Sequence, residues 1–172
     1  MDVQVLGCGG RVFKTGQTTS FATGDDGDFQ AGTPVPSPRF TDNGDGTITD
    51  NLTGLTWLKN ASCLGQQTWA NALAAANALA DSNVACSLED GSVAGDWRLP
   101  NRNELTSLLD LGTFDPALPA GHPFMNVADF YWSSTTVAVE TIAAWNVFFN
   151  FGSVGISDKA NRVFVTAVRG GS

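Results

Sequence analysis

Hydrophobic and turn-forming residues alternate in short runs over the C-terminal part of the chain, from Tyr131 to Gly171. Apolar runs occupy 144–149 (AWNVFF), 154–156 (VGI) and 163–168 (VFVTAV), and turn chemistry fills 150–153 and 158–162. Runs of Val, Phe, Ile and Thr bounded by Gly, Asn, Asp and Ser are typical of strands joined by hairpins. The pattern predicts a compact antiparallel meander with 163–168 as its last strand, Phe149 and Val154 in its core, and one exposed side.

Two segments have the periodicity of helices. In residues 68–80 (TWANALAAANALA), Thr68 is expected to be the N-cap, and the apolar face contains positions 69, 72, 73, 76, 79 and 80. Asn101 and Glu104 have the spacing of a capping box, so a second helix is expected to begin there. Its buried stripe contains the leucines at 105, 108, 109 and 111, and it ends near Gly112.

The rest of the sequence indicates that these elements belong to one α+β domain. Residues 39–59 predict a β-hairpin, because turn signals at 43–46 and 51–54 punctuate the strand-like runs 47–49 and 55–58. Residues 1–37 lack periodicity and are interpreted as an extended arm, which leaves 38–172 as the domain. The order hairpin, helix, helix, Pro-rich loop (113–130) and meander indicates two helices packed on a mostly antiparallel, loop-rich sheet.

Composition and charge narrow the class of partner. The chain has 172 residues, of which 42% are hydrophobic, enough for one good core. A net charge of −8 repels phosphate backbones, so nucleic acid is not an expected partner. No window approaches the roughly 20 apolar residues of a membrane-spanning helix, so no membrane insertion is expected. The start of the chain lacks the pattern of a signal peptide, and we expect an exported protein whose leader is not part of this chain.

The cysteines support that expectation. Cys63 and Cys86 flank the first predicted helix in polar, turn-rich text, which permits either a disulfide or two reduced thiols. We favour the disulfide, since small loop-rich exported domains commonly use such bridges, and a loop of this size contributes about 3 kcal/mol. Cys8 is the odd cysteine, either free or separated from its partner by truncation.

Catalytic and metal-binding patterns are not evident in the sequence. The sole histidine, His122, is interpreted as a loop residue, and neither a nucleophile elbow, a zinc spacing nor a phosphate-binding loop occurs. An EF-hand fails because Thr41 and Leu52 would stand where carboxylates belong. A looser calcium site through the aspartates at 42, 45 and 50 is less favoured than turn-forming roles. The acids at 89, 90 and 96 are interpreted as solvated, and no cofactor, metal or enzymatic activity is expected.

The exposed side of the C-terminal meander is the candidate binding surface. Aromatic, Arg and small polar residues on turns held by a rigid scaffold are the usual composition of a recognition patch. For Phe151 and Ile156, ordinary core packing is an equally open interpretation. The candidate binding residues are Phe148, Asn150, Phe151, Ser153, Gly155, Ile156, Ser157, Asp158, Ala160, Asn161, Arg162, Val163 and Thr166.

Several motifs resemble a known bacterial family. FTDNGDGTITDNLTGLTWLKN, DWRLPNRNEL, YWSSTT, AWNV, Lys159 and VRGG occur in an order similar to domains related to the C-terminal domain of the Legionella collagen-like adhesin, from about Thr15 to Gly171. The resemblance implies a C-type lectin-like fold, related also to formylglycine-generating enzymes, and mostly exported binding modules. The chain lacks the EPN or QPD motif of calcium-dependent lectins and has Trp145-Asn146-Val147 where they have Trp-Asn-Asp. The reactive cysteine pair of the enzymes is also not matched.

A narrower resemblance is to variable proteins diversified by retroelements, in which AAC codons become NNC codons. Every candidate binding residue belongs to the set that NNC can encode. The leading hypothesis is a display module on the bacterial surface or outside the cell, with Phe148, Phe151, Ile156 and Arg162 as anchors for a protein or surface partner. The alternative is a fixed adhesin domain that binds surface polysaccharide without calcium. An enzyme of the formylglycine-generating sort is a third, less favoured reading.

Overall fold

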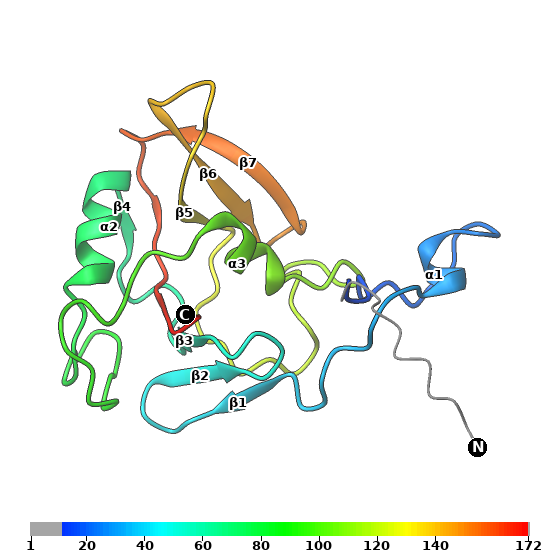
Figure 1. Cartoon of the computed structure of the whole chain (residues 1–172), viewed down its shortest axis with the longest axis horizontal. Helices are drawn as coiled ribbons and strands as arrows, with labels where there is room; N and C mark the ends of the chain where they lie inside the picture. Colours follow the sequence, from blue (N-terminus) through cyan, green and yellow to red (C-terminus); the bar gives the residue numbers. More distant parts are fainter. Residues whose placement is uncertain (1–11, 172) are drawn as a thin grey trace, which may run out of the picture.

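A smaller antiparallel sheet is formed by the first three strands of the domain and the last strand of the chain. The computed structural model describes residues 12–171, so Cys8 lies outside the described residues. The strand order is β1-β2-β3-β9, and β9 returns from the C-terminus to lie beside β3 (Figure 1). The predicted hairpin is confirmed by the pairing of β2 with β3, and β1 adds a further strand. The strands are β1 (Phe40–Asp42), β2 (Thr47–Asp50), β3 (Thr56–Leu58) and β9 (Val168–Arg169).

A larger sheet contains the C-terminal strands in the order β4-β8-β5-β6-β7. Its pairs are antiparallel except β5 with β8, which run parallel. The α+β prediction with mostly antiparallel, C-type lectin-like sheets is confirmed. The strands are β4 (Gln66–Gln67), β5 (Phe130–Thr136), β6 (Ala143–Phe148), β7 (Ser153–Asp158) and β8 (Val163–Phe164).

The prediction that 163–168 is one strand of the meander is wrong. The segment divides into β8 in the larger sheet and β9 in the smaller one, and β7 is left without a strand on its outer side. Val163, Val165 and Ala167 are buried, and so is Val168. A strand with apolar residues on both faces is stable when it is covered on both sides, and this segment therefore runs through the core between the sheets.

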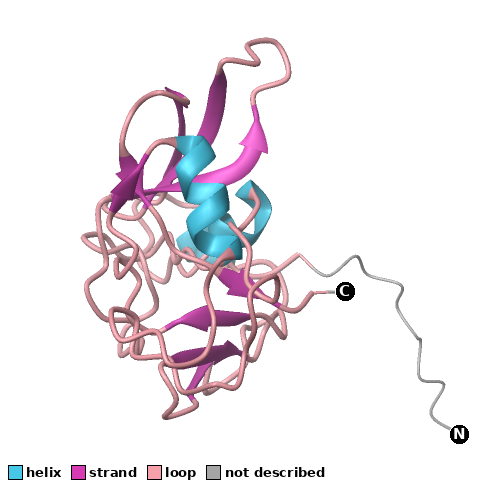
Figure 2. Cartoon of the chain, turned by 90° about the vertical axis from the view of Figure 1, so that its left-hand side faces the viewer, coloured by secondary structure: helices cyan, strands magenta, loops and turns pink. Residues whose placement is uncertain are grey.

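Two helices pack against the larger sheet, and the smaller sheet lies below them in the turned view (Figure 2). Helix α2 (Trp69–Asn77) has Thr68 at its N-cap position, although the Thr68 side chain makes no capping hydrogen bond. Helix α3 (Arg102–Ser107) begins with the predicted capping box of Asn101 and Glu104. It ends well before Gly112, because the chain turns away to pair the Asp110 amide with the Ala117 carbonyl.

The N-terminal arm is less extended than expected. It contains α1 (Asp26–Phe29), capped by the Asp25 side chain, and a bridge between Phe13 and Thr33. The division of the chain at residue 37 stays a prediction.

The core is built around aromatic residues and one covalent bridge. Trp57, Trp97 and Trp132 are completely buried. The predicted disulfide between Cys63 and Cys86 is confirmed, with an S–S distance of 2.08 Å. It connects the segment before α2 to the loop after it, so the helix is held at both ends.

Candidate ligand-binding surface

A buried ion pair connects the N-terminal hairpin to α3. The Arg39 side chain donates from Nε to Asp50 Oδ1 at 2.7 Å and from Nη2 to Asp50 Oδ2 at 3.0 Å. Nη2 also donates to the Ser107 carbonyl at 2.7 Å. Both side chains are almost fully buried, so this bidentate pair is shielded from solvent.

A second arginine joins three of the motifs that carry the family resemblance. Arg98 donates to both Glu104 oxygens at 2.7 and 2.6 Å, and to the Gly170 carbonyl at 3.1 Å. Burial opposes ionisation of Glu104, but hydrogen bonds from Arg98 and the Asn101 amide outweigh it and lower the pKa of Glu104. The WRLPN, NEL and RGG segments are therefore tied together at one point.

A third pair corrects an expectation about the acidic loop. Asp90 was expected to be solvated, but its side chain is fully buried and lies 3.2 Å from Arg169 Nη2. The Arg169 guanidinium also lies over the Trp97 ring, 5.3 Å from its centroid. The solvated interpretation is wrong for Asp90 because the loop folds inward onto the last strand.

The three aspartates considered for calcium have other partners. Asp42, Asp45 and Asp50 each accept the amide of the residue two positions on, at 3.1, 3.0 and 2.9 Å, as in Asx-turns. Asp42 also accepts from Lys59 Nζ at 2.6 Å, and that bond lowers the pKa of Asp42. Among residues 12–171, no group of three or more His, Cys, Asp or Glu could hold a metal ion.

The hairpin of β6 and β7 positions most of the candidate binding residues. Its register is continuous, from Ala143 opposite Asp158 to Phe148 opposite Ser153. The turn after β7 is held by Lys159, whose Nζ lies 4.0 Å from the centroid of the Trp69 ring and donates to Thr136 Oγ1 and the Thr141 carbonyl. The strand therefore has a defined place against the rest of the domain.

The structure distributes the candidate residues over several places rather than one patch. Side chains alternate along β7, so Ile156 and Asp158 face one side of the sheet, and Ser153, Gly155 and Ser157 face the other. Asn150 and Phe151 lie in the turn before β7, and 160–162 lie in the turn after it, about 20 Å apart along a strand of this length.

Val163 and Thr166 belong to the core. Both are buried, Val163 within strand β8 of the larger sheet and Thr166 between β8 and β9, so neither side chain is available to a ligand. The expected place of 163–168 as the last strand of a meander suggested an exposed face, but the segment is covered on both sides.

Several of the expected contact residues already have partners within the protein. The Phe148 ring stacks on Phe130 with centroids 5.1 Å apart. Ser157 Oγ accepts from Asn146 Nδ2 at 2.7 Å, and Arg162 Nη2 donates to the Gln66 carbonyl at 2.8 Å. Asp158 Oδ1 accepts the Ala160 amide at 2.8 Å. These bonds shape the surface and leave fewer groups free for a ligand.

The exposed apolar residues lie along the outer side of β7. Phe151 is 75% exposed and Ile156 is 50% exposed, so neither is packed in the core. Val154 is 41% exposed, so the expectation that it lies in the core is wrong. We call Phe151, Val154, Ile156 and Asp158 the β7 rim. The sequence predicts Val154 to be buried because an apolar residue in an edge strand and one in an inner strand occur in the same sequence pattern.

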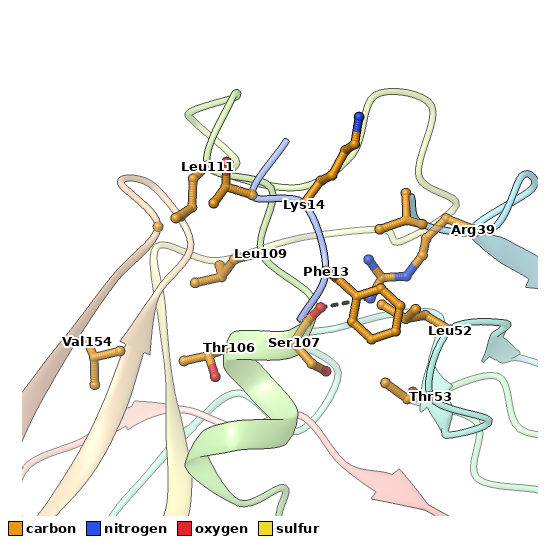
Figure 3. A pocket seen from close by; sticks show the side chains of 13 residues that line it. Phe13, Lys14, Arg39, Leu52, Thr53, Thr106, Ser107, Leu109, Leu111 and Val154 are labelled. Atoms are coloured by element: carbon orange, nitrogen blue, oxygen red, sulfur yellow. Dashed lines mark hydrogen bonds between the residues drawn. The ribbon is translucent and has the colours of Figure 1, made fainter. Parts of the chain in front are cut away.

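A cavity of about 390 Å³ lies beside the β7 rim. Figure 3 shows Val154 at one side of it, Leu109 and Leu111 near its middle, and Phe13 across from them. Leu111, expected in a buried helical stripe, is exposed here because α3 ends early. The lining is mainly apolar, with hydroxyls from α3, the turn between β2 and β3 and the N-terminal arm, and with the basic residues Lys14 and Arg39.

The comparisons with known proteins identify the family. The family model for the Lcl C-terminal domain matches residues 46–169, most of the chain. The chain therefore belongs to the Lcl C-terminal domain family, a family related to an adhesin. No curated protein matches the chain. Within residues 12–171, no helix has both the length and the apolar character that crossing a bilayer requires.

Proposed function

We propose that this domain is a non-catalytic module that binds a protein or surface partner through the β7 rim and its flanking turns. The observation that carries the proposal is the exposure of Val154 and Ile156 on the edge strand β7 and of Phe151 in the turn before it. Clustered exposed apolar side chains next to polar turns mark interaction sites more often than isolated ones do. Aromatic and aliphatic anchors of this kind supply most of the energy of a recognition surface.

The scaffold beneath the rim supports the same proposal. The ion pairs of Arg39, Arg98 and Arg169 connect distant segments, and Lys159 fixes the turn that ends β7. A rim held this firmly loses little conformational entropy when a ligand binds. Both described cysteines are joined in a disulfide, which leaves neither as a nucleophile. The module acts by binding alone, and its place is the cell surface or the extracellular space.

We also propose that the rim and its turns are diversified by a retroelement, so that related chains present different side chains on one scaffold. All the rim and turn residues among the candidates belong to the NNC-encoded set. Lys159 and Arg169 are not among the proposed variable positions, because their side chains make contacts that hold the fold.

The binding function is tested with the whole chain against two immobilised probes, a library of random 12-residue peptides and an array of neutral polysaccharides. Phe151→Ala and Ile156→Ala are expected to weaken any selected ligand at least tenfold, with an unchanged melting temperature. Val93→Ala, which removes another exposed apolar side chain from a distant loop, is the matched control and is expected to change affinity less than twofold.

Ligands that bind the control and the rim variants equally well would overturn the proposal. Calcium-independent binding of a neutral polysaccharide that ignores the rim variants would replace it with a glycan-binding adhesin domain.

A further inference from the structure

The four sheet edges of the domain differ in how they are protected. Strand β1 has three residues and ends in Asp42, which pairs with Lys59. Strand β4 has two residues, and the Gln66 carbonyl accepts a hydrogen bond from the Arg162 side chain. Strand β9 is covered by Arg98, which exchanges both backbone hydrogen bonds with Val168. Short strands, charges and covering segments are the devices that keep edges from pairing with other chains.

Strand β7 is neither short nor covered, and its only charge lies at its end. It has six residues, its register with β6 has no bulge, and it contains no proline, lysine or arginine. Asp158, at its end, is its only charged residue. Among residues 12–171, no backbone hydrogen bond joins the outer side of Val154 or Ile156 to another segment. A long, apolar and uncovered edge is a template for one more strand.

The free backbone groups belong to the same residues as the exposed side chains. The Lys159 amide donates to the Ile142 carbonyl, which marks that pair as a hydrogen-bonded pair of the antiparallel ladder. Since such pairs alternate, Ser157, Gly155 and Ser153 point their backbone groups toward β6. Val154 and Ile156 therefore point their N–H and C=O groups away from the sheet, in the direction a partner would approach.

The cavity supplies a specific pocket next to this edge. Val154 and Gly152 form its β7 side, and Leu109 and Leu111 continue its apolar lining. A strand added to β7 would place every second side chain on the face of Val154 and Ile156, above this cavity. In strand addition, main-chain hydrogen bonds give affinity and pockets for alternate side chains give specificity.

We propose that β7 binds an extended segment of a partner protein as an added strand, with apolar side chains at alternate positions and a neutral or basic overall charge. This inference rests on the proposed function and names its partner class. Only a peptide backbone presents donors and acceptors at the spacing that the edge of β7 presents. The charge follows from the net −8 of the chain, which attracts basic segments and repels acidic ones.

A second copy of the chain is the less suitable occupant. Pairing β7 with its own copy brings together two molecules that each carry a net charge of −8. Like-charge juxtaposition of this kind suppresses association.

The test uses the whole chain and peptides selected from a library of random 12-residue sequences. Hydrogen exchange of the Val154 and Ile156 amides is expected to be fast in the free protein and slowed at least tenfold by a bound peptide. N-methylation along the peptide is expected to abolish binding at every second position and to leave it nearly unchanged between them.

A pair of variants isolates the backbone contribution. Ile156→Pro removes an amide that faces away from β6, so it leaves the hairpin intact and is expected to weaken the peptide at least tenfold. Ile156→Val keeps that amide and a branched apolar side chain, and is expected to weaken it far less. Melting temperatures of both variants establish that the domain is folded, and Ile156→Lys serves as a second edge-blocking variant if Ile156→Pro is not.

The outcomes separate this inference from the proposed function. A ligand that loses affinity with Phe151→Ala or Ile156→Ala but leaves the Val154 and Ile156 amides unprotected supports the binding function and overturns strand addition. Selection of polysaccharides and no peptides overturns strand addition as well. Protection of the two amides in a concentrated, peptide-free sample that sediments as a dimer overturns the peptide partner in favour of a second copy.

Discussion

Arg39 and Asp50 form the most deeply buried ion pair among the described residues, and each satisfies the other in the absence of water. Asp50 also accepts the Leu52 amide and the Thr53 hydroxyl, so its carboxylate organises the turn between β2 and β3. Removing either partner leaves a charge in a medium that solvates it poorly. The pair therefore makes the hairpin and α3 depend on each other.

Arg39→Met is expected to lower the free energy of unfolding by about 3–5 kcal/mol, because it strands the Asp50 carboxylate in the core. Urea denaturation of the variant and the wild type measures the difference. Lys59→Met breaks the more exposed pair of Lys59 and Asp42, and is the matched control with a much smaller expected loss, because solvent screens that pair. Equal losses in the two variants would show that Arg39 acts through something other than burial.

At the scale of elements, the start of α3 contains an ionisable group, the Glu104 carboxylate, whose hydrogen bonds depend on pH. The pKa of Glu104 is lowered from its ordinary value of 4.5 by the bonds from Arg98 and the Asn101 amide, which outweigh its burial. A group with a depressed pKa in the folded state contributes stability that is fully present above the unfolded value and is lost as the pH falls through the folded value. This helix should therefore weaken in acid.

Glu104→Gln is expected to remove that part of the acid sensitivity. In wild type, the melting temperature should fall as the pH drops below about 4.5, and the slope in the variant should be shallower there. At neutral pH the variant should be about 1 kcal/mol less stable, because a neutral amide makes weaker bonds to the Arg98 side chain. Parallel slopes for both proteins would exclude Glu104 as the titrating group.

The disulfide is the other element-scale restraint. Replacing both Cys63 and Cys86 by serine is expected to lower the free energy of unfolding by about 3 kcal/mol, since the bridge closes a loop across a sequence separation of 23. Thermal unfolding of the double variant and of reduced wild type should agree. A double variant as stable as oxidised wild type would show that loop closure by the bridge does not stabilise the fold.

Local signals in the sequence predict the elements that depend on neighbours along the chain. The capping box of Asn101 and Glu104, the helix after Thr68 and the hairpin of β2 and β3 each arise from residues a few positions apart. The fate of 163–168 depends instead on Gly65 and Leu58, which bind Val165 and Ala167 from distant parts of the chain. No local pattern specifies such partners. The sequence pattern of a strand buried on both sides is the same as that of a strand in a meander.

The candidate binding surface was likewise predictable only where exposure depends on neighbouring residues in the chain. Exposure of Phe151 follows from its place in a four-residue turn, whereas exposure of Val154 follows from the absence of a strand outside β7. The first is a property of the segment and the second is a property of the whole sheet. Val163 and Thr166 were misplaced for the same reason, because their burial is decided by β4, β5 and the opposite sheet.

At the scale of the whole molecule, the scaffold and the exposed positions divide the C-terminal region into two classes. Trp145 lies beneath the Arg102 guanidinium at 4.9 Å, Lys159 lies over Trp69, and Arg169 pairs with Asp90. Val163 and Thr166 are in the core although NNC codons can encode Val and Thr. A diversified chain that remains folded can vary only where neither packing nor an ion pair restricts the side chain.

Sequencing the gene over codons 140–172 in many individuals of the source population should therefore reveal a particular distribution. Phe151, Ser153, Ile156 and the turn residues Ala160 and Asn161 are expected to vary. Val163 and Thr166 should be restricted to small apolar or isosteric residues, because a charge or a larger side chain there would cost more stability than a domain of this size retains. Variation at Val163 and Thr166 equal to that at the exposed positions would contradict this division. A uniform sequence with no near-copy and no reverse transcriptase beside it would remove diversification and leave a fixed binding rim.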